Sequence, residues 1–376
     1  MTAVFVEIDD KSQPPATGSQ PRATESQPPA TDTQPAVTDC WYLAGATAAG
    51  KTKVGVELAQ RINAEIISLD SMAVYRDMDI GTAKPTAAER AVVPHHLLDL
   101  VPPTHDFSLS EYVDAAHAAI ADIRSRGKEV LFVGGTPLYL KALLRGVYQG
   151  PPADWEFRAA IERELQTVPL AALHQRLQVI DPLLAAKLHP NDMRRIVRGL
   201  EVFKTTGQRL SHLQTQFDEA HPAAAMRVFV LSWPRDELHR RIEARVDAMF
   251  AAGLVAEVQA LLSKYHSLSR TAIQAVGYRE VIESLSDSSK FQVPSSKLSE
   301  PANSQPETWN LKPETPASAG LADRVKARTR QFARRQETWF RSLSECQTIP
   351  MHDGFKPSDV TEEILSVVNK VSHERV

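Results

Sequence analysis

The sequence predicts an α/β protein in which a parallel sheet is flanked by helices. Apolar strand-like runs alternate with helical spacing from residue 41 onward. The first run, residues 41–44, leads into Gly45-Ala46-Thr47-Ala48-Ala49-Gly50-Lys51-Thr52, and a helical pattern covers residues 52–62. A strand, a glycine-bounded loop and a helix in this order form a unit that binds polyphosphates.

The loop at residues 45–52 matches the pattern G-x-x-x-x-G-K-T. Its glycines let the backbone curl so that successive N–H groups point inward, while the Lys51 ammonium neutralises phosphate charge and the Thr52 hydroxyl suits Mg²⁺. The sequence therefore predicts a P-loop NTPase-like sheet. The expected diphosphate-binding residues are Gly45, Ala46, Thr47, Ala48, Ala49, Gly50, Lys51 and Thr52.

Length and composition restrict the classes to which the protein can belong. The 376 residues suffice for more than one domain, and a formal net charge of −3 with a pI of about 6.5 gives no overall attraction to polyanions. Two cysteines exclude a disulfide framework and a Cys-rich zinc site. No apolar run has membrane-spanning length and no signal peptide begins the chain, so we expect a soluble cytoplasmic protein without membrane contact.

Two segments lack apolar periodicity. Residues 1–38 repeat units similar to Ser-Gln-Pro-Pro-Ala-Thr, and residues 287–320 are rich in proline and serine around Trp309. Such segments bury too little apolar surface to offset the entropy of ordering. We expect a disordered tail over residues 1–38 and a disordered loop insertion over residues 287–320.

The first core elements follow the phosphate loop in order. Residues 65–69 predict a second buried strand and residues 129–133 a third, with an alanine-rich helix over residues 111–126 between them. Gly134-Gly135-Thr136 then opens a helix over residues 137–144. Strands that alternate with helices in this way predict a parallel sheet.

The rest of the chain divides around a helical insertion. Residues 39–150 form the first part of the core, and residues 223–286, with a strand at 227–231, form the second. Residues 151–222 show helical spacing and no convincing strand, which predicts an insertion standing off the sheet with a cleft between the two. Residues 321–376 hold a basic helix and the final core elements.

Asp70 directly follows the second strand, at the sheet edge where the phosphate loop lies. Doubly wound sheets bind their ligands at this edge. Asp70 is therefore interpreted as a general base, with a helix N-cap or a magnesium ligand as alternatives. The third strand ends in Gly134-Gly135-Thr136, where many phosphate-loop hydrolases carry a magnesium-binding aspartate, and this argues against ATP hydrolysis.

Two arginines follow the strand at residues 227–231. Arg241 and Arg245 share one face of an amphipathic helix. An arginine there would close over phosphates opposite Lys51 and stabilise a leaving diphosphate. The alternative is a solvated face that pairs with Glu237 or Glu243.

A basic helix is expected over residues 324–341, with Glu337 as the only acid in that range. Basic residues on an otherwise acidic protein favour contact with a nucleic-acid backbone. The alternative is a solvated helix, or one that faces acidic residues elsewhere. The basic residues are Arg324, Lys326, Arg328, Arg330, Arg334, Arg335 and Arg341, with Phe332, Trp339 and Phe340 between them.

Together these motifs resemble those of the tRNA dimethylallyltransferases, also called tRNA isopentenyltransferases, of the shorter bacterial type. The resemblance runs in family order from about residue 41 to residue 343. Several linked motifs make it specific, which the phosphate loop alone would not. The matching blocks are residues 45–52, 69–75, 78–85, 95–99, 134–139, 189–195, 274–280 and 329–339.

The resemblance implies transfer of a dimethylallyl group from dimethylallyl diphosphate to N6 of adenosine 37, next to the tRNA anticodon. It implies that Asp70 accepts the N6 proton, that Thr136 positions the base, and that Lys51, Thr52 and Arg245 hold the diphosphate with Mg²⁺. We expect a monomer. The implied tRNA contacts are Asp70, Ser71, Met72, Ala73, Thr136, Arg158, Arg194, Arg195, Ile196, Val197, Arg198, Gln274, Ala275, Val276, Gly277, Tyr278 and Arg279.

The phosphate loop departs from the family's usual Gly-Pro-Thr-Ala-Ser-Gly-Lys-Thr by carrying Ala46 and Ala49. Loss of the serine hydroxyl removes one phosphate contact, so we expect weaker or altered donor affinity. The principal alternative function is a P-loop small-molecule kinase in which Asp70 activates a hydroxyl. A non-catalytic RNA-binding module is a third interpretation, but it leaves the phosphate loop unexplained.

Overall fold

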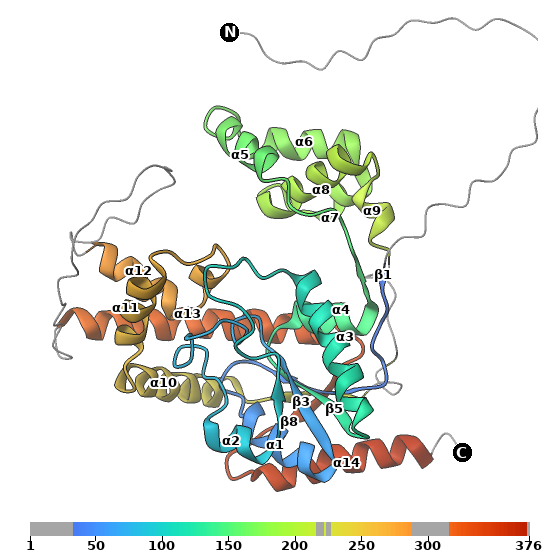
Figure 1. Ribbon diagram of the computed structural model, residues 1–376, viewed down its shortest axis with the longest axis vertical. Helices are drawn as coiled ribbons and strands as arrows, with labels where there is room; N and C mark the ends of the chain where they lie inside the picture. Colours follow the sequence, from blue (N-terminus) through green and yellow to red (C-terminus); the bar gives the residue numbers. More distant parts are fainter. Residues whose placement is uncertain (1–32, 216–221, 223–226, 288–315, 374–376) are drawn as a thin grey trace, which may run out of the picture.

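The computed structural model describes residues 33–215, 222, 227–287 and 316–373 (Figure 1). Within these residues the main sheet has six strands in the order β4-β3-β5-β2-β7-β8, and all of its pairs are parallel. The predicted parallel α/β fold is confirmed. The strands are β2 (Trp41–Gly45), β3 (Ala64–Leu69), β4 (His95–His96), β5 (Glu129–Gly134), β7 (Arg227–Ser232) and β8 (Gln347–Pro350).

The register of the sheet brings three loops together. Every residue of β2 and β3 is buried, as expected for strands covered on both faces. Gly134 at the end of β5 pairs with Leu69 of β3 on one side and with Ala44 of β2 on the other. Because parallel strands end at one edge, the phosphate loop, the turn after Leu69 and the turn after Gly134 are neighbours.

Helices pack around the sheet, and α10, α11 and α12 lie to one side of it (Figure 1). α1 and α3 both pack against β3 and β5, and α14 packs against α1. A capping box at Ser108, whose hydroxyl accepts from Glu111 N–H, starts α3. The core helices are α1 (Lys51–Arg61), α2 (Ala87–Val92), α3 (Leu109–Ser125), α4 (Pro137–Arg145), α10 (Arg235–Ala251), α11 (Leu254–Tyr265), η3 (Ala272–Gln274), α12 (Tyr278–Asp287), α13 (Pro316–Arg341) and α14 (Pro357–His373).

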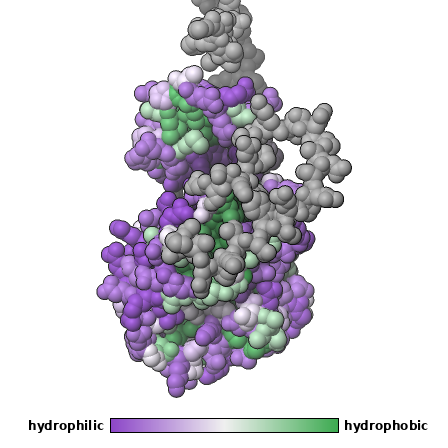
Figure 2. All heavy atoms as spheres, turned by 90° about the vertical axis from the view of Figure 1, so that its left-hand side faces the viewer, coloured by the Kyte–Doolittle hydropathy of each residue, from purple (hydrophilic) through white to green (hydrophobic). Residues whose placement is uncertain are grey.

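The insertion is helical and has its own core. Ile161, Leu177 and Ile196 belong to an apolar cluster separate from the cluster under the sheet. Figure 2 shows this part as a lobe set off from the rest of the molecule. The guanidinium of Arg270, in the core, lies 5.2 Å from the Trp155 ring centre, so the two parts also touch. The lobe contains α5 (Trp155–Glu164), α6 (Leu170–Ile180), α7 (Pro182–Lys187), α8 (Met193–Thr206) and α9 (Leu210–Leu213).

The boundary of the N-terminal tail differs from the expectation. β1 (Thr33–Gln34) pairs antiparallel with β6 (Val147–Tyr148), and the buried Val37 donates its N–H to Leu143 O at 2.6 Å. Residues 33–38 are therefore part of the fold, because their backbone groups find partners that local composition does not reveal. Residues 1–32 and 288–315, which include Trp309, lie outside the described residues.

The C-terminal boundary of the expected insertion also shifts, since α13 already begins at Pro316. No single helix of the described part has the length and apolar composition of a membrane span; the bent pair α10 and α11 meets those criteria only when its two helices are taken together.

Candidate functional site

The phosphate loop has the backbone shape that its pattern predicts. Gly50 has φ +90° where α1 begins, and Ala48 has φ +63°, a left-handed conformation uncommon for a residue with a Cβ. Lys51 Nζ donates to Ala46 O at 2.8 Å. The first N–H groups of a helix have no partner within it, so the start of α1 presents free donors to an anion.

Lys51, Arg245 and Asp70 form the electrostatic centre of the site. Desolvation, and then the charge of Arg245, lower the pKa of Lys51 to about 7, and Asp70 opposes this. Desolvation likewise lowers the pKa of Arg245, again opposed by Asp70. Within the described residues Arg245 Nε has no hydrogen-bond partner. Two desolvated cations against one carboxylate leave an excess of positive charge, which an anion would neutralise.

Asp70 supports a turn rather than a helix. Its Oδ1 accepts from Met72 N–H at 2.8 Å, and residues 72–75 form a turn in which Tyr75 N–H donates to Met72 O at 3.2 Å. The N-cap interpretation is therefore wrong. The position is compatible with both other interpretations, a general base or a magnesium ligand, because the carboxylate belongs to the same charge cluster as Lys51 and Arg245.

Thr136 connects two of the three loops. Its Oγ1 accepts from Ser71 N–H at 3.0 Å, and its own N–H donates to Leu69 O at 3.1 Å. The glycines before it allow this approach, because a Cβ on Gly134 would lie 2.1 Å from Leu69 O. Thr136 and Asp70 therefore follow adjacent strands and lie at the same edge of the sheet.

Gln336 is a site residue that the sequence analysis missed. Its side chain, 4% exposed, accepts from Thr47 N–H at 2.9 Å and donates to Gly135 O at 2.6 Å. It belongs to the buried face of α13, with Thr329, Ala333 and Phe340. An amide on that otherwise largely apolar stripe was the signal that could have identified it.

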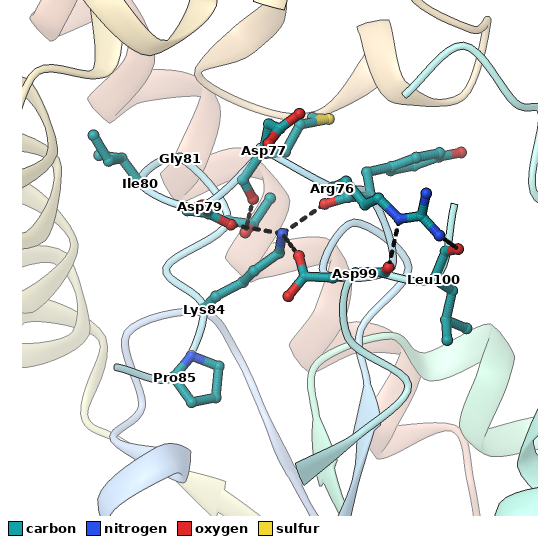
Figure 3. Close-up of polar contacts among 12 residues, drawn as sticks. Arg76, Asp77, Asp79, Ile80, Gly81, Lys84, Pro85, Asp99 and Leu100 are labelled. Carbon is teal, nitrogen blue, oxygen red and sulfur yellow. Dashed lines mark hydrogen bonds and ion pairs between the residues drawn. The ribbon is translucent and has the colours of Figure 1, made fainter. Parts of the chain in front are cut away.

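The segment at residues 79–84 is held by the buried ammonium of Lys84 and by carboxylates around it. Lys84 Nζ lies 2.7 Å from Asp79 Oδ1 and 2.5 Å from Asp99 Oδ1 (Figure 3). Glu257 accepts the N–H groups of Asp79 and Ile80 at 3.1 and 2.8 Å. Asp99 also donates its N–H to Ala73 O at 3.1 Å, which links these contacts to the segment that follows Asp70.

The expected tRNA contacts at residues 274–279 separate into two groups. Gln274 and Arg279 are exposed and are 3.3 Å apart between Oε1 and Nη1. Tyr278 is fully buried and donates to Glu257 at 2.5 Å, and Ala275 is buried as well. The side chains of Tyr278, at the start of α12, and Ala275, which follows η3, are therefore closed to an RNA, because both pack into the core. Val276 is partly exposed and Gly277 is buried.

The expected tRNA contacts in the insertion also divide into exposed and buried residues. Arg194 and Arg195 are exposed, whereas Ile196 and Val197 are buried in the lobe's core, so contact of these two side chains with RNA is not supported. Arg158 and Arg198 lie 2.7 and 2.6 Å from the carboxylate of Glu201. Burial would raise the pKa of Glu201, but the two guanidinium groups lower it below its ordinary value.

The basic residues of α13 divide into some that face acids and some that are exposed. Lys326 and Arg330 pair with Asp247 and Glu243 of α10 at 2.6 and 2.7 Å, so they face acids as the alternative expected. Arg334 and Arg335 are exposed. A cavity of about 710 Å³ between α10, α13 and the strands β7 and β8 reaches the phosphate loop, and its lining includes Ala46, Arg235, His239, Arg334, Glu337 and Arg341.

A family model described as IPP transferase matches residues 73–343. The chain belongs to the IPP transferase family. It is 45% identical to the tRNA dimethylallyltransferase of Rhodopirellula baltica over 341 residues, 89% of this chain and 94% of the relative. It is 42% identical to the enzyme of that name from Geobacter metallireducens, over 80% of this chain and 89% of the relative.

Solved structures agree with this membership. The full-length tRNA isopentenylpyrophosphate transferase of Bacillus halodurans is 33% identical with a TM-score of 0.59, and the match covers 90% of this chain and 98% of that one. A eukaryotic dimethylallyltransferase crystallised while acting on tRNA is 26% identical with a TM-score of 0.63, over 84% and 75% of the two chains. The sequence-based function, that of a tRNA dimethylallyltransferase, is confirmed over the kinase alternative.

Proposed function

We propose that the anion held at residues 45–52 is the diphosphate of dimethylallyl diphosphate, and that this chain transfers the dimethylallyl group to N6 of the adenosine next to the tRNA anticodon. One observation carries the proposal. Lys51 and Arg245 are desolvated cations, and among the described residues Asp70 is the acid whose charge acts on both, beside a loop and helix start that present N–H donors. That arrangement suits a bound dianion or trianion better than a neutral ligand.

The charges suit an allylic transfer. Breaking the bond between the allylic carbon and the diphosphate oxygen places negative charge on the diphosphate, where Lys51 and Arg245 stabilise it. The N6 amine then attacks the allylic carbon, and its proton becomes acidic as the new bond forms. Asp70 accepts that proton, while Thr136, fixed to Ser71 N–H, positions the base.

The residues present also fit Mg²⁺ bound through its ligand. No cluster of three or more His, Cys, Asp or Glu side chains that would hold a metal occurs among the described residues. Mg²⁺ commonly binds through one or two protein groups together with substrate phosphates. We propose that Thr52 contributes such a group and that the ion would add positive charge at the diphosphate.

The RNA would lie across two basic surfaces. Arg194 and Arg195 are exposed on the insertion, and Arg334 and Arg335 are exposed on α13. Contact with both would bring an anticodon arm over the sheet edge. The target base must leave its stack to reach Asp70, because N6 cannot approach a donor held at the phosphate loop from within a folded anticodon loop. We further propose that the chain acts as a monomer in the cytoplasm.

Radiolabelled dimethylallyl diphosphate and ATP, each supplied with bulk tRNA, test the proposal. We expect label from the prenyl donor to enter tRNA and to be recovered as N6-prenylated adenosine after digestion. Transfer of ATP phosphate to a small metabolite, with no label in the RNA, would overturn it. Nucleoside analysis of tRNA from cells that lack the gene gives the matching result in vivo, which is loss of the prenylated base.

A further inference from the structure

The backbone of the phosphate loop requires external support. Ala48 has φ +63° and Gly50 has φ +90°, so two of three consecutive residues are left-handed, and Ala48 bears a Cβ that disfavours this conformation. Ala46 and Ala49 have neither a proline ring nor a side-chain hydroxyl that would restrict the loop from within. Within the loop, Ala46 O accepts from Ala49 N–H at 3.2 Å and from Lys51 Nζ at 2.8 Å, whereas the carbonyl groups of Ala48 and Ala49 are held by other elements.

Two side chains from outside the loop hold consecutive carbonyl groups. Trp233, which follows β7 and is 8% exposed, donates from Nε1 to Ala49 O at 3.0 Å. Arg241, on α10, donates from Nε to Ala48 O at 3.0 Å. The Arg241 guanidinium lies 4.2 Å from the centre of the Trp233 ring, so each side chain orients the other.

Arg241 has no other role among the described contacts. The two acids expected to neutralise it are taken, since Glu237 pairs with Arg240 and Glu243 pairs with Arg330. Arg241 Nη2 instead lies 3.4 Å from the point where a Cβ on Gly50 would stand. The guanidinium thus packs on the open face of Gly50, between the loop and the indole ring.

The direction of these carbonyl groups decides what the loop presents. A trans peptide unit is planar, and its C=O and N–H point in opposite directions. Ala49 C=O and Gly50 N–H share one peptide unit, so holding Ala49 O toward Trp233 turns Gly50 N–H to the other side. In the preceding unit Arg241 holds Ala48 O, and Ala49 N–H on the opposite side donates to Ala46 O at 3.2 Å, which closes a turn within the loop.

We propose that Trp233 and Arg241 are positioning residues that keep the phosphate loop in the conformation that binds a diphosphate. The inference rests on the proposed function of this loop. It assigns to Arg241 a geometric role, distinct from the charge that Lys51 and Arg245 supply. Donor binding should depend on the pair, whereas tRNA affinity should not.

The test measures binding of inorganic pyrophosphate by calorimetry, binding of tRNA, and steady-state kinetics. Trp233→Phe keeps a ring for Arg241 to stack on but removes the Nε1 donor. Arg241→Lys keeps the positive charge but loses the planar, stacked guanidinium. We expect each variant to weaken pyrophosphate binding and to raise the donor KM by about three- to tenfold, the equivalent of one hydrogen bond, with tRNA affinity unchanged.

The double variant should lose less than the product of the two single effects, because both act on one loop. Arg61→Gln is the control: Arg61 lies at the far end of α1 from the loop, its side chain is 43% exposed and pairs with Glu57, and pyrophosphate binding should match wild type. Wild-type affinity in Trp233→Phe and Arg241→Lys, or equal losses for tRNA and pyrophosphate, would overturn the positioning role alone. If the wild-type protein binds no pyrophosphate, the proposed function is overturned, and the positioning role with it.

Discussion

The side-chain amide of Gln336 accepts a hydrogen bond from Thr47 N–H at 2.9 Å, across 289 positions of sequence. The same amide donates to Gly135 O at 2.6 Å, in the turn that precedes Thr136. One buried side chain of α13 therefore sets the distance between the phosphate loop and the turn that is proposed to position the base. Since α13 also carries the exposed Arg334 and Arg335, the helix that is proposed to contact RNA is hydrogen-bonded directly to the phosphate loop.

Replacing Gln336 should impair catalysis without loss of RNA binding. Gln336→Leu leaves Thr47 N–H and Gly135 O buried without partners, at about 1–3 kcal/mol each. We expect kcat/KM to fall by at least about tenfold, which corresponds to 1.4 kcal/mol. Steady-state kinetics and a tRNA-binding titration measure the two effects.

The control for this variant is Gln331→Leu, at an exposed position of the same helix. Gln336→Glu adds a pH test: a charged carboxylate accepts from Thr47 N–H but cannot donate to Gly135 O, whereas the protonated acid does both. Its activity relative to wild type should therefore rise as the pH falls. Wild-type kinetics in Gln336→Leu would contradict the connection.

Pyrophosphate binding should take up a proton above about pH 7. The pKa of Lys51 is lowered from 10.5 to about 7 by desolvation and by Arg245, and a bound anion favours the charged form. Affinity should thus fall as the pH rises above 7, by at most about tenfold per unit. Calorimetry in buffers of different ionisation enthalpy counts the protons taken up.

Lys51→Arg is the control, because a guanidinium stays charged over this range and the ligand's own ionisation is the same for both proteins. Equal proton uptake by both proteins would rule out Lys51 as the source. In the ligand-free protein, the contribution of Lys51 to stability changes with pH in the opposite direction to that of a lysine in a salt bridge. The unfolded chain binds the additional proton between pH 7 and 10.5, so the contribution of Lys51 to stability increases as the pH rises through this window.

Asp70→Asn should separate catalysis from binding. Asparagine keeps an oxygen that can accept from Met72 N–H, so the turn is preserved, but it removes the proton acceptor. We expect kcat to fall by about 10²–10⁴. Pyrophosphate affinity should be equal or higher, because the substitution removes the negative charge of Asp70, which acts on both Lys51 and Arg245.

Asp122→Asn, at an exposed position of α3, controls for loss of a charge elsewhere. The measurements are single-turnover kinetics, tRNA affinity and pyrophosphate affinity. A parallel decrease in kcat and in tRNA affinity would indicate that Asp70 grips RNA and does not accept the proton.

Neutralising Arg334 and Arg335 should weaken tRNA binding in a salt-dependent way. Each arginine that contacts a phosphate releases counterions, so replacing both by glutamine should reduce the slope of log K against log salt by up to about two. Binding titrations at several salt concentrations measure the slope. Arg61→Gln, on α1 and paired with Glu57 at 3.3 Å, should leave it unchanged. An unaltered slope in the double variant would remove these arginines from the RNA interface.

Features that depend on neighbours along the chain were predictable. The buried strands β2, β3, β5 and β7 appear as apolar runs because both faces of a parallel sheet are covered. The phosphate loop appears as a motif because its glycines and Lys51 act within eight residues. Asp70 and Thr136 were predictable as neighbours, since both follow parallel strands that end at one edge.

Contacts between distant segments were not predictable in this way. Whether Arg241 pairs with an acid or holds Ala48 O depends on how α10 packs against β7 and the loop, and 193 positions separate the two groups. Tyr278 matches a motif implied to bind tRNA, yet packing buries it against Glu257. Residues 33–38 appear to be tail by composition, but a strand partner over 100 positions away orders part of them.

The sequence by itself determined the order of the elements, the phosphate loop and the edge of the sheet where the chemistry takes place, because local propensity and motif spacing act over short stretches of chain. Only the tertiary structure decided which side chains hold that loop, which arginines remain exposed and which charges lose their solvent. These properties arise when segments far apart in sequence pack together and exclude water.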